Sequence, residues 1–326
     1  MIVIMKNFIL FGLILFLLGA CVSGALPLMS APVRIGVPAT DSVPTMIIRP
    51  SGTLSPVATA SLPATATSFA TVPPEVTATF PVTATSFATI TPVVTMPTAV
   101  FVKQGPGKII CPILLYHHIA ISKTNNIYYV PPLEFRAQMQ ALKQWGYTSI
   151  SPTLLAKAIN FGAKLPERPV VISFDDGDLS VYTDAFPIMQ EFGFTGVNYI
   201  VVNYIGMEGF MSVDQLKELA AAGWETGSHS MTHSDLTQNR RVEWEVVQSR
   251  HSLEELLGVK VETFAYPYGI KTVVSLGLVK DNYRAAMGLG SLVRQEPGNL
   301  FYLWRRPVDP GWDLHTFGSF LPWNTP

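Results

Sequence analysis

Short apolar runs alternate with segments of helical spacing from about residue 108 to the C-terminus. The expected strands cover 109–116, 169–174, 196–202, 224–228 and 263–266. The expected helices cover 133–145, 181–192, 212–222 and 242–257. Strands that alternate with helices predict an α/β fold with a mostly parallel sheet and crossover helices. Residues 108–326 are enough for a barrel-like form, whose active site would lie at the carboxyl ends of the strands.

The N-terminus is typical of an export signal. Lys6 precedes an apolar run over 8–18, and Leu-Gly-Ala leads directly into Cys21, an arrangement similar to a bacterial lipoprotein signal. The run is shorter than the roughly 20 residues that a membrane span needs. We therefore predict a signal peptide over 1–21 with a lipid-modified Cys21. Ordinary cleavage after Ala20 and an uncleaved anchor remain alternatives, and all three place the remainder outside the cytoplasm, at the cell surface or secreted.

Residues 22–107 differ sharply in composition from residues 108–326. Thr, Pro, Ala, Ser and Val dominate, and the stretch 63–74 recurs almost unchanged as 81–92. Frequent prolines break helices and interrupt strand ladders, so we predict a disordered linker or stalk here. The expected domain organisation is thus a signal over 1–21, a linker over 22–107 and a catalytic domain over 108–326.

The net charge of the chain bears on which kinds of partner it can bind. The formal net charge is -1, whereas a nucleic-acid-binding protein normally carries a basic face. We therefore expect no nucleic-acid partner, and we expect the chain to be a monomer.

Chemically capable side chains follow the expected strands. Asp175 and Asp176 come directly after 169–174, where successive side chains should point to opposite sides and take different roles. His229 and His233 follow 224–228, and their four-residue spacing would place both imidazoles on one side of a helical turn. Two histidines and one carboxylate would leave open coordination positions, as a catalytic metal site requires. A solvated Asp-Gly turn and a pair of surface histidines are the alternatives.

These segments resemble the polysaccharide deacetylase family, the NodB-like carbohydrate esterases. The matching motifs are Ser-Phe-Asp-Asp-Gly at 173–177, His-Ser-Met-Thr-His at 229–233 and Phe-Ala-Tyr-Pro-Tyr-Gly at 264–269, with softer matches at 112–118, 211–212 and 283–286. The pattern is most similar to the branch that acts on poly-N-acetylglucosamine. The resemblance implies a distorted (β/α)7 barrel.

The resemblance also implies roles for individual residues. Asp175 would be the general base, and Asp176, His229 and His233 would bind a divalent metal, usually Zn²⁺, with Co²⁺ or Ni²⁺ as alternatives. The backbone N–H of Tyr268 is our candidate for stabilising the oxyanion, since that transition-state charge needs a fixed donor.

The sequence departs from the family pattern in three places, one of which is Asp178, because the residue after the first motif is often tyrosine in this branch. Ala265 stands where the third motif often begins with arginine, and either Arg305 or Arg306 is a possible substitute. A C-terminal Leu-His motif, which supplies the general acid in many relatives, is not evident. His117, at the end of the first strand, is our preferred general acid, and His315 is the alternative.

The predicted function is a metal-dependent hydrolase that removes N-acetyl groups from an N-acetylhexosamine polysaccharide at the cell surface. The expected partners are this acetylated polymer and, through the N-terminal lipid or signal anchor, the membrane. Two alternatives remain: an O-acetyl xylan esterase, and a catalytically inactive carbohydrate-binding protein of the same fold.

Overall fold

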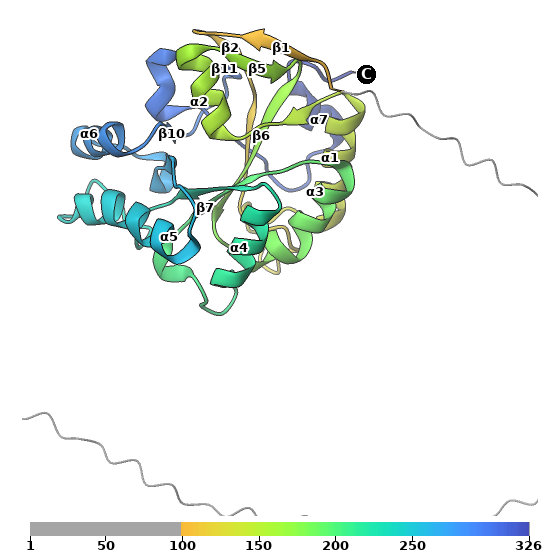
Figure 1. Ribbon diagram of the computed structural model, residues 1–326. Helices are drawn as coiled ribbons and strands as arrows, with labels where there is room; N and C mark the ends of the chain where they lie inside the picture. The colour runs from red at the N-terminus through yellow and green to blue at the C-terminus, as the bar shows by residue number, and fades with distance from the viewer. Residues whose placement is uncertain (1–98, 326) are drawn as a thin grey trace, which may run out of the picture. The chain divides into compact units, whose positions relative to one another are not determined.

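The computed structural model describes residues 99–325, and its centre is a curled sheet surrounded by helices (Figure 1). The sheet strands are β3 (Ile113–Tyr116), β4 (Thr148–Ser149), β6 (Pro169–Asp176), β7 (Val197–Ile200), β8 (Glu225–Ser228), β9 (Thr263–Ala265), β10 (Ala285–Met287) and β12 (Arg306–Pro307). Their order is β10-β9-β8-β7-β6-β3-β12, with β4 beside β6, and every pairing is parallel. The α/β class predicted from the sequence is confirmed.

The two ends of the sheet are joined by one segment of chain, residues 303–307. Leu303 donates a hydrogen bond to the carbonyl of Ala286 in β10, and Arg306 is paired with Leu114 in β3. The segment therefore lies between the first and last strands and turns the sheet into the distorted barrel that the sequence predicted.

In the described part of the chain, the α-helices around the barrel are α1 (Pro132–Gln144), α2 (Pro152–Phe161), α3 (Phe186–Phe192), α4 (Val213–Ala221), α5 (Ser249–Leu257), α6 (Val273–Asn282) and α7 (Leu314–Ser319). Short turns complete the chain: η1 (Val181–Ala185) and η3 (Trp244–Gln248) are π-helical, and η2 (Val202–Tyr204), η4 (Pro267–Gly269) and η5 (Pro297–Tyr302) are 3₁₀. The helices expected over 181–192 and 242–257 thus each contain a π turn near their N-terminal end, a distortion often found at functional sites.

Strand alternation divides the core into two parts. Along β6, Val170 and Ile172 pack in the cluster that contains Phe135 of α1, whereas Val171 packs with Tyr199 in the other cluster. Side chains of a strand point alternately to its two faces, so one cluster faces the outer helices and the other fills the barrel. Asp175 continues the row of Val171, which places it inside the barrel.

Ordered structure begins earlier than the predicted boundary at residue 108. Residues Phe101–Gln104 form β1, which pairs antiparallel with β5 (Ala163–Pro166), and β2 (Ile109–Ile110) pairs with β11 (Arg294–Gln295). The prediction assigned this stretch to the linker because it directly follows the Thr/Pro-rich segment, but β5 supplies a hydrogen-bonding edge that only the tertiary structure reveals. The predicted signal peptide, the predicted lipid-modified Cys21 and the predicted linker up to residue 98 lie outside the described residues.

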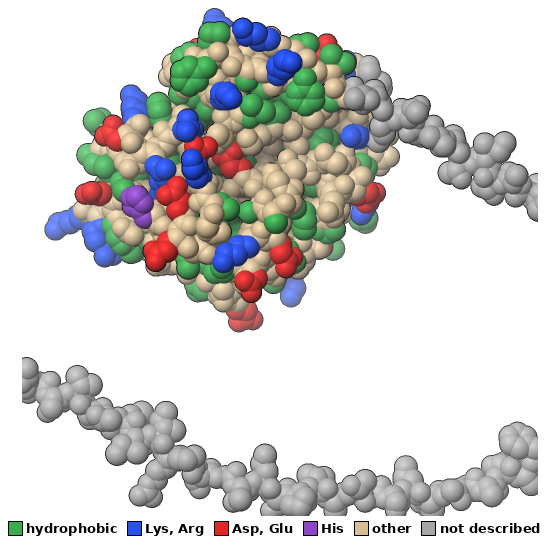
Figure 2. All heavy atoms as spheres, in the orientation of Figure 1, with side chains coloured by type: hydrophobic (Ala, Val, Ile, Leu, Met, Phe, Trp, Pro, Cys, Tyr) green, Lys and Arg blue, Asp and Glu red, His purple; other side chains and the backbone are tan. Residues whose placement is uncertain are grey.

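The described surface is mixed in character. Figure 2 shows lysine and arginine side chains next to aspartate and glutamate side chains over the face in view. Between residues 99 and 325, none of the helices combines the length and apolar character needed to span a membrane.

Candidate active site

A pocket of about 560 Å³ opens at the carboxyl ends of the strands. Its polar wall includes Asp175 and Asp176 from the end of β6 and His229 and His233 from the loop after β8. His117 joins them from the end of β3. Parallel strands bring residues from distant parts of the chain to one edge, which is where such barrels place their chemistry.

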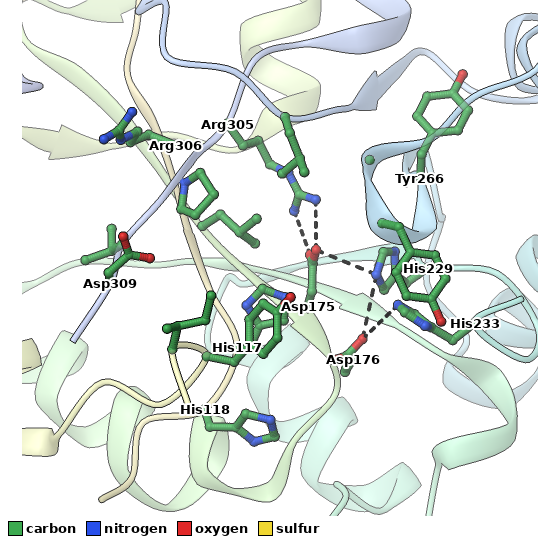
Figure 3. Close-up of a pocket in the computed structure, with 18 residues that line it drawn as sticks. His117, His118, Asp175, Asp176, His229, His233, Tyr266, Arg305, Arg306 and Asp309 are labelled. Atoms are coloured by element: carbon green, nitrogen blue, oxygen red, sulfur yellow. Dashed lines mark hydrogen bonds and ion pairs between the residues drawn. The ribbon is translucent and has the colours of Figure 1, made fainter. Parts of the chain in front are cut away.

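Asp176, His229 and His233 form a compact cluster of potential ligands. One ligand atom from each lies within 4.8 Å of the others, and Asp176 Oδ1 is 3.7 Å from His229 Nε2 and 3.5 Å from His233 Nε2 (Figure 3). Asp176 Oδ1 is buried and has no hydrogen-bond partner, although buried polar atoms almost always have one. A divalent cation with nitrogen and oxygen ligands fits this donor set and would satisfy the orphaned oxygen.

The backbone explains why both aspartates reach one pocket. Simple alternation predicted that Asp175 and Asp176 would point to opposite sides, but both line the pocket. Asp176 has a φ of 73°, in the left-handed region, so the strand ends there and its side chain turns back toward the cluster. The periodic pattern could not predict this, because it assumes that the strand continues.

The segment that carries the two histidines is a loop and not the helical turn expected from their spacing. Ser230 and His233 both have positive φ, 73° and 60°, and the Ser230 hydroxyl accepts a hydrogen bond from the His233 N–H at 2.9 Å. The expected convergence of His229 and His233 is nevertheless present, since their ring centroids are 4.8 Å apart. A tight loop brings them together instead.

The protonation state and orientation of the His229 ring suit a metal ligand. Its ring is buried, and burial lowers its pKa to about 4, so the imidazole is neutral near pH 7. Nδ1 lies 2.8 Å from the carbonyl oxygen of Ala265, an acceptor, so Nδ1 carries the proton and donates it. The Nε2 lone pair is therefore free to face Asp176. Such hydrogen bonds fix the tautomer and orientation of metal-binding histidines.

Arg305, one of the two possible substitutes for the arginine missing at Ala265, pairs with Asp175. It is buried, and it donates from Nη1 to Asp175 Oδ1 at 2.6 Å and from Nη2 to Oδ2 at 2.8 Å (Figure 3). Arg306, the other possibility, packs its guanidinium over Phe320 at 3.7 Å. Both arginines line the pocket, but successive residues of an extended segment point to opposite sides, and Arg305 is the one that reaches Asp175.

The two aspartates differ in their electrostatics. Burial alone would raise the pKa of Asp175, but the Arg305 guanidinium overcomes this and lowers it to about 2. The pKa of Asp176 is raised to about 7, by burial and by the neighbouring Asp175 charge. A negative charge at Asp176 thus needs a cation beside it, whereas the charge of Asp175 is already balanced.

The structure shows which candidates for proton transfer and oxyanion binding lie in the pocket. His117 lines the pocket, and burial lowers its pKa to about 4. His315 is exposed on α7 and is not among the pocket-lining residues. Tyr268 lies on the pocket wall with a φ of 58°, and its ring is 4.6 Å from that of His233.

A second histidine–aspartate pair was not predicted. His118 also lines the pocket, although adjacent residues of an extended strand normally point to opposite sides. Its Nδ1 is 2.8 Å from Asp178 Oδ2, and the other carboxylate oxygen accepts a hydrogen bond from the Ser180 N–H. The charge of Asp178 is therefore directed to His118 and the following turn. The adjacent residues His117 and His118 were visible in the sequence, but nothing in the sequence indicated that His118 would pair with Asp178.

Comparison with known proteins gives consistent relatives. The family model described as Polysaccharide deacetylase matches residues 162–285. The polysaccharide deacetylase family protein YxkH of Bacillus subtilis (strain 168) is 28% identical over 234 residues, which are 69% of this chain and 80% of that protein. A Staphylococcus epidermidis poly-beta-1,6-N-acetyl-D-glucosamine N-deacetylase is 27% identical over 177 residues, 49% of this chain and 61% of that enzyme. The chain thus spans less than two thirds of the staphylococcal enzyme.

A solved structure extends the comparison. The crystal structure of a polysaccharide deacetylase from Bacillus cereus has a TM-score of 0.59 at 26% identity, and the match covers 65% of this chain and 69% of that one. The similarity therefore includes the arrangement of the strands as well as the sequence motifs.

Proposed function

Residues 162–285 belong to the polysaccharide deacetylase family, and on that premise we propose that the chain is a metal-dependent hydrolase that removes N-acetyl groups from an N-acetylhexosamine polymer. The observation that carries the proposal is the position of the Arg305–Asp175 pair directly beside the cluster of Asp176, His229 and His233. His229 Nε2 is 3.6 Å from Asp175 Oδ2, so a base and a set of ligands share one pocket.

The metal would be held by Asp176, His229 and His233. When bound, a divalent metal lowers the pKa of a water toward about 7 and polarises the acetamide carbonyl. Zn²⁺ suits two imidazoles and one carboxylate, and Co²⁺ or Ni²⁺ can occupy a similar donor set.

Asp175 would accept the proton of the attacking water. Arg305 keeps the carboxylate ionised and fixes its orientation through two parallel hydrogen bonds. The same contact makes Asp175 a weak base, so the water has to be made acidic for this transfer to occur. His229 is uncharged near pH 7, so it would not offset the negative charge of Asp175.

His117 would deliver the proton that the leaving amine requires. Because its pKa is about 4, the ring is neutral near pH 7, so His117 would first take from Asp175 the proton that Asp175 accepted from the water and would then donate it to the amine. The backbone N–H of Tyr268 remains our candidate for stabilising the developing oxyanion, and the position of Tyr268 on the pocket wall supports it.

Exposed aromatic rings in the lining of the pocket support a sugar polymer as the substrate. Tyr128 and Tyr268 line the pocket and are 52% and 57% exposed, so their rings are available to apolar faces of sugar rings. The name of the staphylococcal relative supports poly-β-1,6-linked N-acetylglucosamine as the first substrate to test.

We place this activity at the outer face of the cell membrane or in the secreted fraction. The proposal rests on the signal-like run before Cys21 and on the Thr/Pro-rich segment that follows it.

The decisive experiment is an acetyl-release assay on three substrates: β-1,6-linked N-acetylglucosamine oligomers, chitin oligomers and acetylated xylan. Free amine and free acetate should both be released when the N-acetylated oligomers are the substrate, and Asp175→Asn should abolish both products. Acetate released only from xylan would identify an O-acetyl esterase instead. Binding to the oligomers without any product would identify a non-catalytic carbohydrate-binding protein.

A further inference from the structure

Glu245 is a buried carboxylate that belongs to none of the motifs described above. It lies in the π turn η3, and only 1% of its surface is exposed. Its Oε2 accepts hydrogen bonds from the backbone N–H groups of Met231 at 3.0 Å and Thr232 at 2.9 Å. Its Oε1 accepts from the Thr232 hydroxyl at 2.7 Å and from Asn239 Nδ2 at 2.8 Å.

The charge of Glu245 is not neutralised locally. Within residues 99–325, no lysine, arginine or histidine forms a salt bridge with it. A buried charge is costly unless it is well hydrogen-bonded, and here four uncharged donors surround the carboxylate. If this side chain only held the loop closed, a neutral hydrogen-bond acceptor would be sufficient.

The hydrogen bonds of Glu245 fall between the two histidines. Met231 and Thr232 are the second and third residues after His229, and His233 follows directly. In this loop Ser230 and His233 both have left-handed φ values, which are unfavourable for residues other than glycine and persist only where surrounding contacts hold them. Glu245 supplies two such contacts through its single Oε2 atom.

We propose that Glu245 is a positioning residue that fixes the loop between His229 and His233 so that both imidazoles face one metal ion. The inference rests on the proposed metal site. Glu245 forms no hydrogen bond or ion pair with either imidazole, and it would act through the backbone of Met231 and Thr232. Its negative charge would also favour a cation in the pocket over an empty site.

Glu225 offers a matched control. It lies at the start of β8, at the opposite end of the strand from His229, and accepts hydrogen bonds from the Thr153 N–H at 3.1 Å and the Thr263 hydroxyl at 2.8 Å. It therefore resembles Glu245 in its hydrogen bonding but has no contact with the histidine loop. A general loss of stability should follow from Glu225→Gln and Glu245→Gln alike.

The test is a Zn²⁺ titration of metal-free protein against a chromophoric chelator, together with thermal unfolding of the same samples. Glu245→Gln keeps the shape, but its amide cannot accept all four hydrogen bonds. We expect its zinc affinity to fall by about 10- to 100-fold, the range usual for supporting residues around a metal. Glu225→Gln should leave zinc affinity unchanged at matched folded fraction.

A milder variant covers the case in which Glu245→Gln does not fold. Asn239→Ala removes one hydrogen bond to Glu245 Oε1 without altering the histidine loop, so a smaller loss of zinc affinity is expected. Unchanged zinc affinity in the folded variants, or equal losses of zinc affinity in Glu245→Gln and Glu225→Gln, would overturn the proposal for Glu245. The proposed metal-dependent function would not be affected by that result. If the wild-type protein binds no metal, the metal-dependent function fails with it.

Discussion

Arg305 and Asp175 are separated by 130 positions in the sequence, yet they form a buried pair joined by two hydrogen bonds of 2.6 and 2.8 Å. The closing segment 303–307 carries Arg305 between β10 and β3, and from there its guanidinium enters the barrel. Alignment of a planar guanidinium with both carboxylate oxygens fixes the direction of the carboxylate as well as its charge.

The first prediction concerns this alignment. Arg305→Lys retains a positive charge but cannot donate two parallel hydrogen bonds, so we expect turnover to fall by about 10²-fold, as for a displaced catalytic group. Weaker stabilisation of the carboxylate also raises the pKa of Asp175. The acidic limb of the pH–rate profile should therefore move to higher pH, because the base becomes protonated earlier as the pH falls.

Arg306→Lys is the control for that experiment. Its guanidinium packs over Phe320 and forms no hydrogen bond with Asp175, so turnover and the acidic limb should both change little. Equal effects of the two substitutions, measured at matched folded fraction, would show that the pair with Asp175 has no special role.

The second prediction separates the base from the ligands. Asp175→Asn should largely abolish turnover while metal remains bound, because Asp175 is paired with Arg305 and is not a member of the ligand cluster. His229→Ala should lose both turnover and metal. Metal content by elemental analysis, together with turnover, checks this, and complete metal loss in Asp175→Asn would make the assigned roles wrong.

Much of the site was predictable because it lies in short motifs. Asp175 and Asp176 lie at the end of one expected strand, His229 and His233 follow another, and parallel strands bring their carboxyl ends together. The local geometry was not predictable: the left-handed φ of Asp176 and the loop that replaces the expected helical turn depend on contacts made after folding.

Long-range pairing was the harder problem. Nothing in the sequence distinguishes Arg305 from Arg306 until the closing segment is in place and its alternation is known. Glu245 gave even less signal, since a glutamate within an expected helix is usually on a solvated face. The boundary of the ordered domain was missed for a similar reason, because β1 depends on the edge of β5.

The third prediction tests metal dependence directly. Chelation should abolish activity, and added Zn²⁺ or Co²⁺ should restore it, because two histidines and one carboxylate leave coordination positions open. Restoration must follow from the metal after removal of the chelator, with buffer alone as the control. Full turnover of protein shown by elemental analysis to be free of metal would exclude the mechanism.

The fourth prediction assigns the general acid. His117 lies in the pocket, whereas His315 is exposed on α7. A general acid typically contributes about 10²–10⁴-fold, so His117→Ala should lower turnover by that order and retain metal, and His315→Ala should cost much less. The two variants are compared at matched metal content and folded fraction. A larger loss in His315→Ala would transfer the role to the C-terminal helix.

The fifth prediction concerns where the catalytic domain begins. Composition placed the boundary at residue 108, but Phe101–Gln104 form β1 and pair with all four residues of β5. Deletion of residues 22–98 should therefore leave catalysis on short soluble oligomers nearly unchanged, since the Thr/Pro-rich stretch has little means of packing on the barrel.

Extending the deletion to residue 104 removes β1 and leaves the edge of β5 without a partner. We expect a lower melting temperature for this longer deletion than for the shorter one, because each lost backbone hydrogen bond contributes roughly 0.5–1.5 kcal/mol to stability. Turnover per folded molecule should be similar in both, since β1 contributes no residue to the pocket. Equal melting temperatures would show that β1 does not stabilise the domain, and a large fall in turnover after the shorter deletion would place the N-terminal segment within the active unit.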